Sequence, residues 1–215
     1  LDASYDLAGC SAAGLFYWHK HAKNSPIKPT LFLMAWLQVL SCLIIPASNL
    51  WIALQRNLAV PMLVSFDAPW ERSIRSINDS TEFSIVQPPL GWKHPSLVGK
   101  FTFGFATYPG ISFPHIYSDW TGYSKLTFAV YSEQNKTERL HLRIHDRQHN
   151  HKHSDRYNQT ILITPGLNSI EIDLDQIKQS PKSRELDLSR IVTIGLFMTK
   201  LKQPVTLYID NIELR

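Results

Sequence analysis

The chain has 215 residues, of which 44% are hydrophobic, with a mean hydropathy of −0.15 and a formal net charge of +4. This length excludes a mini-protein held together by disulfides and leaves room for one or two domains. Charged residues at 19% and aromatic residues at 11% exclude a disordered chain. The two cysteines, Cys10 and Cys42, exclude a disulfide framework and a zinc site built from cysteines.

The first stretch of the chain is hydrophobic and rich in small residues. Residues 4–18 predict part of a membrane helix, in which Gly9, Ala13 and Gly14 would let another helix approach closely. Because the sequence begins at Leu1 rather than Met, we expect this helix to be the end of a longer segment. A signal peptide is excluded, since acidic residues stand where a signal peptide has its basic residues.

Residues 30–54 form a second and longer apolar run that contains no Asp, Glu, Lys, Arg or His. A helix that crosses the hydrocarbon core needs about 20 mostly apolar residues, so the run predicts a transmembrane helix. Pro46 lies inside it, as membrane helices tolerate, and Trp36 and Trp51 are candidate anchors at the membrane surface. A buried helix of a soluble protein is the alternative interpretation.

The distribution of lysines predicts the orientation in the membrane. The connector 19–29 holds three lysines, whereas basic residues are scarce beyond the second apolar run until Arg72. Loops rich in Lys and Arg stay in the cytoplasm, so we expect the connector inside and the rest of the chain outside the cell membrane, periplasmic or at the cell surface. The predicted organisation is a membrane region at 1–58 and an exported domain at 60–215.

The predicted exported domain consists of short apolar runs with period-2 alternation, separated by turn residues. This alternation is typical of half-buried antiparallel strands, and many such strands with turns between them predict a β-sandwich or barrel. We expect strands at 61–66, 83–86, 97–106, 112–116, 125–131, 140–145, 157–163, 168–174, 191–198 and 205–214, with helical turns at 174–180 and 187–190.

The order of four segments carries a resemblance to a known fold family. The chain reads DWTGYSKLTFAVYS, then LHLRIHDRQH, then TPGLNSIEIDL and finally TLYIDNIEL, and this order resembles a galactose-binding-like jelly roll. It is similar to carbohydrate-binding modules and to domains of the complex I intermediate-associated type, over roughly residues 65–215. The resemblance implies a mainly-β antiparallel jelly-roll sandwich that binds carbohydrate or a cell-envelope glycan, such as a peptidoglycan-related ligand.

The N-terminal stretch carries a second, short resemblance. Asp2, Asp6 and Gly9 are similar to the last helix of VanZ-like membrane proteins, in which an Asp is followed by Asn four residues later and by Gly three further on. Asp6 stands where that family has Asn. The resemblance implies a bacterial VanZ-like membrane protein fused to the exported β-domain.

A histidine-rich segment, HLRIHDRQHNHKHSDRYN, is the most conspicuous polar feature of the predicted domain. His141, Arg143 and His145 alternate with apolar residues, so we expect them to share the polar face of one strand. Imidazole suits Zn or Cu, and His151 and His153 with a nearby carboxylate would form a metal site. A solvated loop is the alternative, because the segment has no ligand set at a fixed helical spacing.

Aromatic side chains are candidate platforms for a sugar, since sugars present apolar C–H faces. The candidates include Tyr108, His115 and Tyr123. The alternative for Trp120 and Tyr123 is a place in the core. The fold resemblance implies that polar residues of the histidine-rich segment line the ligand-facing side. The predicted ligand-binding residues are therefore Trp92, Tyr117, Trp120, His145, Asp146, Arg147 and His149.

Asp67 and Asp210 form a candidate pair for a structural Ca²⁺. They lie in or beside the first and last predicted strands, which are neighbours in many jelly rolls where Ca²⁺ binds between them. Carboxylate and backbone oxygens are the ligands that Ca²⁺ prefers, although two carboxylates do not fill a shell of six to eight oxygens. Polar residues at strand ends are the alternative interpretation.

Motifs for catalysis are missing from the sequence. It has no GxSxG, no Gly-rich phosphate loop and no cysteine outside the apolar stretches, so we expect a non-catalytic protein. Basic and acidic residues are nearly balanced in the predicted domain, which argues against a nucleic-acid partner. Two alternatives stay open: a metal-dependent or hydrolytic enzyme centred on the histidine-rich segment, and a structural domain that mediates protein–protein contact.

Overall fold

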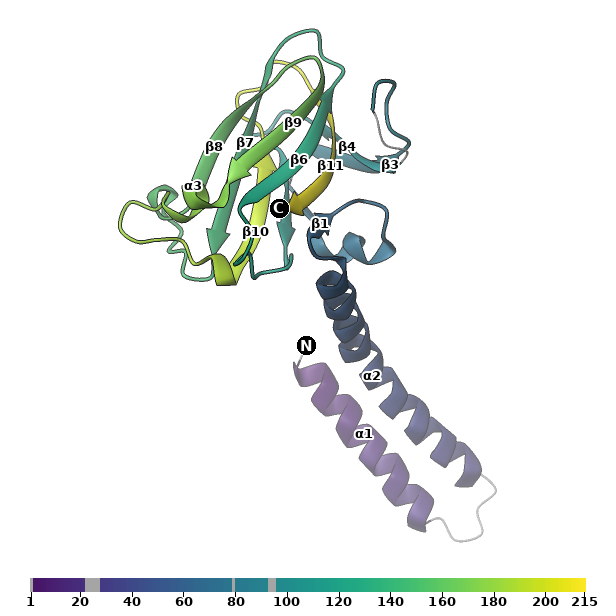
Figure 1. The fold of residues 1–215 in the computed structure, drawn as a ribbon. Coiled ribbons are helices and arrows are strands. Elements are labelled where there is room, and N and C mark those ends of the chain that lie inside the picture. The colour runs from purple at the N-terminus through teal and green to yellow at the C-terminus, as the bar shows by residue number, and fades with distance from the viewer. Residues whose placement is uncertain (1, 22–27, 79, 93–95) are drawn as a thin grey trace. The chain divides into compact units, whose positions relative to one another are not determined.

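The structure is a computed structural model that describes residues 2–21, 28–78, 80–92 and 96–215. The chain divides into two compact units, Leu1–Gln55 and Arg56–Arg215 (Figure 1). The first is built from two helices and the second from two β-sheets, and each is described by itself.

The two helices of the first unit are α1 (Asp2–His21) and α2 (Lys28–Ala59). They form over the two apolar stretches, and α2 continues through Pro46. Residues Phe32–Ala59 of α2 have a mean hydropathy of 1.8 and are long and apolar enough to cross a membrane. In the described part of the chain no other helix meets that criterion, so a membrane crossing by α1 stays a prediction.

Small residues lie between the helices, but not the ones predicted from spacing. A Cβ placed on Gly9 or Gly14 would meet nothing within 4 Å, and Ala13 is exposed. The buried small residues are instead Ala12 on α1 and Ala35 on α2. Within this unit α2 therefore does not pack on Gly9, Ala13 or Gly14, since spacing alone leaves the rotation of a helix about its axis undetermined.

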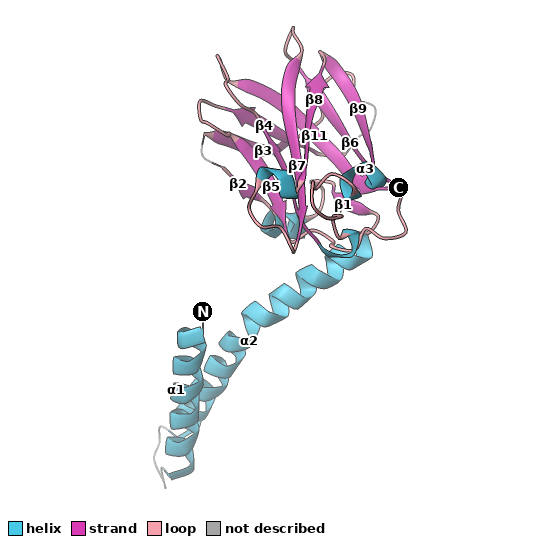
Figure 2. Ribbon diagram, turned by 90° about the vertical axis from the view of Figure 1, so that its left-hand side faces the viewer, coloured by secondary structure: helices cyan, strands magenta, loops and turns pink. Residues whose placement is uncertain are grey.

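The second unit is a sandwich of two antiparallel sheets, as predicted (Figure 2). The six-stranded sheet runs in the order β3 (Thr81–Val86), β4 (Val98–Phe103), β11 (Val205–Leu214), β6 (Lys125–Ser132) and β9 (Gly166–Asp173), with β1 (Met62–Val64) paired to β11. The five-stranded sheet runs in the order β2 (Ser76–Ile77), β5 (Gly110–Pro114), β10 (Ile191–Phe197), β7 (Glu138–Asp146) and β8 (Tyr157–Ile163).

The short helices lie in the connections. The helical turns predicted at 174–180 and 187–190 are α3 (Leu174–Lys178) and the 3₁₀ turn η3 (Leu188–Arg190). Two further 3₁₀ turns, η1 (Pro69–Ile74) and η2 (His153–Asp155), and the two-residue strand β2 were not predicted, because elements this short carry no periodic signal. The strand predicted at 97–106 ends at Phe103, which leaves Phe105 65% exposed.

The core lies between the sheets and follows the predicted alternation. Buried apolar side chains recur at every second position of β6 and β7. Phe66 joins the two layers, since its ring centroid lies 5.8 Å from that of Phe101 on β4 and 6.2 Å from that of Phe113 on β5. Aromatic pairs at these distances add stabilisation beyond their buried area.

The same alternation turns a row of polar residues outward on the five-stranded sheet. On β7 the outward side chains are His141, Arg143 and His145, which confirms the predicted polar face. The register pairs Arg143 with Gly195 of β10, and Gly195 in turn with Ser112 of β5. These paired residues form a polar floor across β7, β10 and β5.

Candidate functional site

Three adjoining hollows run over the outer face of the five-stranded sheet, and we call them together the outer groove. The central hollow has a volume of about 590 Å³. It shares Arg143 and Arg156 with the second hollow, and the second shares Arg147 and Val192 with the third. The hollows therefore adjoin one another, from the middle of β7 and β10 to the end of β10 where Ile191 lies. The central hollow is lined by Asn78, Tyr108, Ile111, Ser112, His141, Arg143, His153, Arg156, Gly195 and Phe197.

A glycine makes the depression possible at its centre. A Cβ on Gly195 would lie 2.6 Å from Nε and 2.8 Å from Cγ of Arg143, closer than such atoms approach. Because Gly195 has no side chain, Arg143 lies across β10 instead of standing away from the sheet. Its Nη2 reaches Ser112 Oγ at 3.4 Å, while its Nε is buried without a hydrogen-bond partner in the described residues.

Aromatic rings form one end of the outer groove, which we call the aromatic end. The imidazole of His141 stacks on Phe197 with a centroid distance of 5.2 Å, and Tyr108 meets Phe197 edge-on at 5.9 Å. Tyr108 is 61% exposed. Burial, and secondarily the charge of Arg139, lowers the pKa of His141. An imidazole that stays neutral and rings open to solvent suit the apolar face of a ligand ring.

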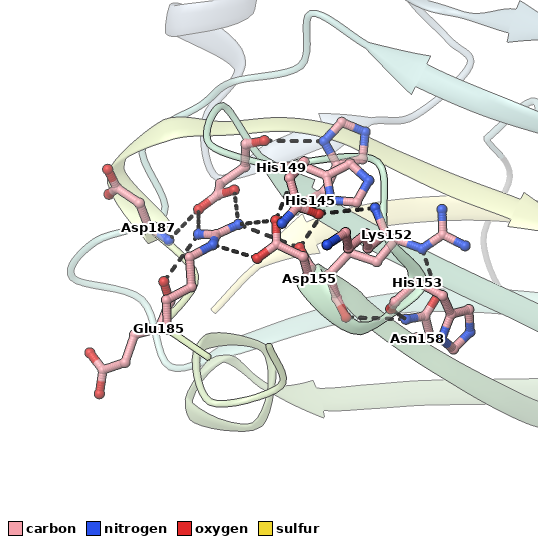
Figure 3. A network of polar contacts seen from close by, with 12 residues as sticks. His145, His149, Lys152, His153, Asp155, Asn158, Glu185 and Asp187 are labelled. Carbon is pink, nitrogen blue, oxygen red and sulfur yellow. Dashed lines mark hydrogen bonds and ion pairs between the residues drawn. The ribbon is translucent and has the colours of Figure 1, made fainter. Parts of the chain in front are cut away.

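Basic side chains line the second hollow, which we call the arginine end. It contains Arg143, His145, Arg147, His149, His151 and Arg156. His145 stacks on His149 at a centroid distance of 4.6 Å, as Figure 3 shows, and His151 meets His149 at 5.6 Å. Burial lowers the pKa of His145, and the neighbouring His149, Arg143 and Arg156 lower it further.

A buried ion-pair network supports the arginine end from beneath (Figure 3). Arg184 donates from Nη2 to Asp146 Oδ1 at 2.8 Å and from Nε to Asp155 Oδ1 at 2.6 Å. The side chains of Asp146 and Asp155 are 0% and 4% exposed. Asp155 also accepts from Asn150 N at 2.9 Å and its carbonyl bonds His149 Nδ1 at 3.0 Å. The network thereby holds the loop after β7, and His149 with it, in one position.

The aromatic residues among the predicted ligand-binding set, Trp92, Tyr117 and Trp120, do not line the outer groove, although the further candidates Tyr108 and His115 do. Trp120 is fully buried, and its Nε1 donates to Tyr117 O at 2.9 Å, so the prediction that it contacts a ligand is wrong. Tyr117 is half-buried and lines none of the three hollows. Trp92 lines a separate hollow on the six-stranded sheet, together with Leu167 and Asn168. The sequence does not show which of the two sheets a tryptophan in a loop will cover.

The predicted polar ligands divide in the same way. His145, Arg147 and His149 line the arginine end. That a ligand binds there stays a prediction. Asp146 borders the same hollow, but its carboxylate points inward and is taken up by Arg184 and by the Asp187 N–H at 2.8 Å. The expectation that Asp146 offers its carboxylate to a ligand is therefore corrected: a strand residue next to an outward one points to the opposite face.

The predicted calcium pair lies at the other sheet, with a third carboxylate beside it. Asp210 on β11 is 0% exposed; its Oδ2 accepts from Ser96 Oγ at 2.9 Å and its Oδ1 has no partner in the described residues. Glu71 is 4% exposed, and its Oε2 is likewise unpartnered there. Burial raises the pKa of Asp210 to about 7, and the charges of Asp67 and Glu71 add to that shift.

Within the described ranges, no three or more His, Cys, Asp or Glu side chains are arranged so that they could hold a metal ion. His151 and His153, the candidates for a Zn or Cu site, line different hollows. A site in the histidine-rich segment therefore lacks the ligand number that such metals require. At Asp67, Glu71 and Asp210, backbone oxygens would have to supply most of a calcium shell.

Comparisons with known proteins place the β-sandwich among solved structures. An exo-β-agarase matches with a TM-score of 0.57 at 18% identity, over 72% of this chain and 25% of that chain. The agarase AgWH50C matches with a TM-score of 0.53 at 16% identity, over 72% and 26%. These likenesses show the fold. A family 11 carbohydrate-binding module from Clostridium thermocellum is similar at a TM-score of 0.49 and 18% identity, over 65% of this chain and 86% of that chain.

The remaining comparisons add no family. The chain spans about a quarter of the length of the agarases that it matches. No family model matches the chain, and no curated protein matches it. The side chains of Asp2 and Asp6, which carry the VanZ-like resemblance, lie outside the described residues. That resemblance stays a prediction.

Proposed function

We propose that the second unit binds a glycan chain along the outer groove, with the sugar rings on the aromatic end. The observation that carries the proposal is the surface formed by Tyr108, His141 and Phe197 beside a polar floor. Aromatic faces and a few fixed polar groups are what carbohydrate recognition requires. The open, elongated groove suits a polymer, and two proteins with this fold are named as agarases.

We further propose that this binding is non-catalytic. Glycoside hydrolysis normally needs two carboxyl groups on either side of the scissile bond. Among the described residues that line the three hollows, Asp146 is the only carboxylate. Its hydrogen bonds to Arg184 and Asp187 hold it in the ionised form below the surface, where it has neither the proton nor the position of a general acid.

A binding screen tests the proposal directly. The full chain, kept in detergent micelles, is passed through native gels that contain neutral and acidic polysaccharides and peptidoglycan fragments. We expect retardation by at least one polymer. A correctly folded sample that migrates freely through every polymer would contradict the proposed function.

The length and hydropathy of α2 and the charge pattern support a location for this module. We propose that α2 anchors the chain in a bacterial cell membrane and that the β-sandwich lies outside, facing the cell envelope. A C-terminal alkaline phosphatase fusion should be active, because this enzyme folds only outside the cytoplasm. The same reporter inserted in the connector at 19–29 should be inactive. An inactive C-terminal fusion of full length would refute the orientation.

We also propose that Ca²⁺ binds beside Asp67 and Asp210 as a structural ion, with backbone oxygens completing its shell. Two buried carboxylate oxygens, which have no partner among the described residues, cost stability unless a cation or proton compensates for them. Oxygen donors of this kind fit a hard cation. When bound, the ion would neutralise the repulsion between the carboxylates of Asp67 and Asp210 and join the segment before η1 to β11.

Thermal unfolding measures this effect. At a Ca²⁺ concentration about 100-fold above Kd, the unfolding midpoint should rise by about 5–10 °C. Asp210→Asn should unfold at a higher temperature than the parent in EDTA, because it removes a buried charge, and should lose the response to Ca²⁺. Asp175→Asn, at an exposed carboxylate, is the matched control. A midpoint that ignores Ca²⁺ would contradict the proposed site.

A further inference from the structure

The arginine end contains more positive charge than the fold requires. Arg143, Arg147 and Arg156 all line one hollow. In the described part of the chain, no ion pair joins any of these three arginines to a carboxylate. The nearby carboxylates of Asp146 and Asp155 form ion pairs with Arg184 instead. The two neutral contacts, Arg143 with Ser112 and Arg156 with Asn158, leave the positive charges uncompensated.

The position of these guanidinium groups makes the excess charge costly. The pKa of Arg156 is lowered by burial and then by the charge of Arg143. Arg143 also has a buried Nε without a partner within the described residues. Like charges brought together and partly desolvated destabilise the domain, unless an anion binds between them.

We propose that the glycan bound by the outer groove carries an anionic group, a carboxylate or a sulfate ester, which is bound between Arg143, Arg147 and Arg156. The inference rests on the proposed glycan binding and names its substrate class. Guanidinium groups match the geometry of carboxylate and sulfate oxygens and form strong charge-assisted hydrogen bonds with them.

The groove also relates the two ends to each other. Arg143 and Arg156 border both the central hollow and the arginine end. A sugar ring on Phe197 and Tyr108 therefore places a neighbouring residue of the polymer over the arginines. Aromatic contact selects the ring, and the arginines select its charged substituent.

The test compares four polymers on the full chain in detergent micelles. Agarose is a neutral galactan, κ-carrageenan is a sulfated galactan, polygalacturonate carries carboxylates, and inorganic polyphosphate is a polyanion without sugar rings. We expect at least one of the two acidic glycans to bind roughly tenfold or more tightly than agarose. That advantage should shrink when salt rises from about 0.1 M to about 1 M, since screening weakens charge contacts. Preference between the two acidic glycans identifies the anion.

Arginine variants locate the charge contact. Arg147 is exposed, so Arg147→Gln leaves the fold intact and should weaken acidic-glycan binding by roughly tenfold. Arg143→Gln should also weaken acidic-glycan binding by roughly tenfold. Its near-UV circular dichroism spectrum should match that of the parent, which would show that the fold is retained. Arg72→Gln removes the same charge from η1, outside the groove, and should leave binding unchanged.

The outcomes separate the two levels of the proposal. Agarose binding as tightly as both acidic glycans, without salt dependence, would overturn the anionic ligand and leave glycan binding standing. Polyphosphate binding as tightly as the acidic glycans would overturn recognition of a sugar. Failure of every polysaccharide in the wider screen would overturn the proposed function itself.

Discussion

Arg184→Met should destabilise the β-sandwich by about 3–5 kcal/mol, because it leaves two buried carboxylates without their shared cation. Arg184 is the sole ion-pair partner of Asp146 in the described structure and the main partner of Asp155. Small domains are stable by only about 5–15 kcal/mol. Thermal unfolding of the full chain, followed by near-UV circular dichroism, should therefore show a large fall in the midpoint.

A matched variant and the pH dependence check the cause. Arg190→Met removes an exposed arginine that lies 3.9 Å from Asp187, and it should cost less than about 1 kcal/mol. The hydrogen bonds from Arg184 and from Asn150 N lower the pKa of Asp155 to about 2. The stabilisation is therefore complete above the unfolded value near 3.8 and is lost as the pH falls through about 2. Equal midpoints for both arginine variants at neutral pH would contradict the role of Arg184.

Trp120→Ala should cost about 3–5 kcal/mol, the usual range for removing a large buried aromatic side chain. The indole is 0% exposed and donates to Tyr117 O, while the backbone N–H of Trp120 donates to Leu188 O at 2.8 Å. If the alanine variant does not fold, Trp120→Phe should fold with a lower midpoint and bind glycan as the parent does. A stable Trp120→Ala protein that has lost glycan binding would instead show that Trp120 contacts the ligand.

Sequence periodicity predicted much of this fold. Leu140, Leu142 and Ile144 point inward and His141 and Arg143 outward, because the period of two in a strand assigns faces without any tertiary information. The long apolar run likewise predicted α2. Periodicity did not show where an alternating run stops, so Phe105 was assigned to a strand that ends two residues earlier.

The site depended on information that one sequence does not contain. Phe197 faces His141, and Gly195 faces Arg143, only because β10 lies between β5 and β7 in a particular register. Phe197, Ser112 and Arg156 were missed for this reason, although the alternation along 191–198 already turned Phe197 to the polar side. Tyr108 was among the aromatic candidates, but the sequence did not show that it lies beside Phe197.

Loop residues were the least predictable, since a loop has no periodicity that assigns its side chains to a face. All three predicted aromatic residues lie in loops. Trp92 lines a hollow on the six-stranded sheet, Tyr117 is half-buried, and Trp120 lies in the core. Arg184 was not singled out at all, because its role depends on two carboxylates brought to it from distant parts of the chain.

We propose that glycan binds to the five-stranded sheet and not to the opposite face. Two hollows with an aromatic side chain compete for that role: the aromatic end with Tyr108 and the hollow with Trp92. Affinity electrophoresis of Tyr108→Ala and Trp92→Ala, in the polymer that retards the parent most, compares them directly. We expect Tyr108→Ala to weaken binding by roughly tenfold or more and Trp92→Ala to bind as the parent does. Loss of binding in Trp92→Ala with full binding in Tyr108→Ala would contradict the account.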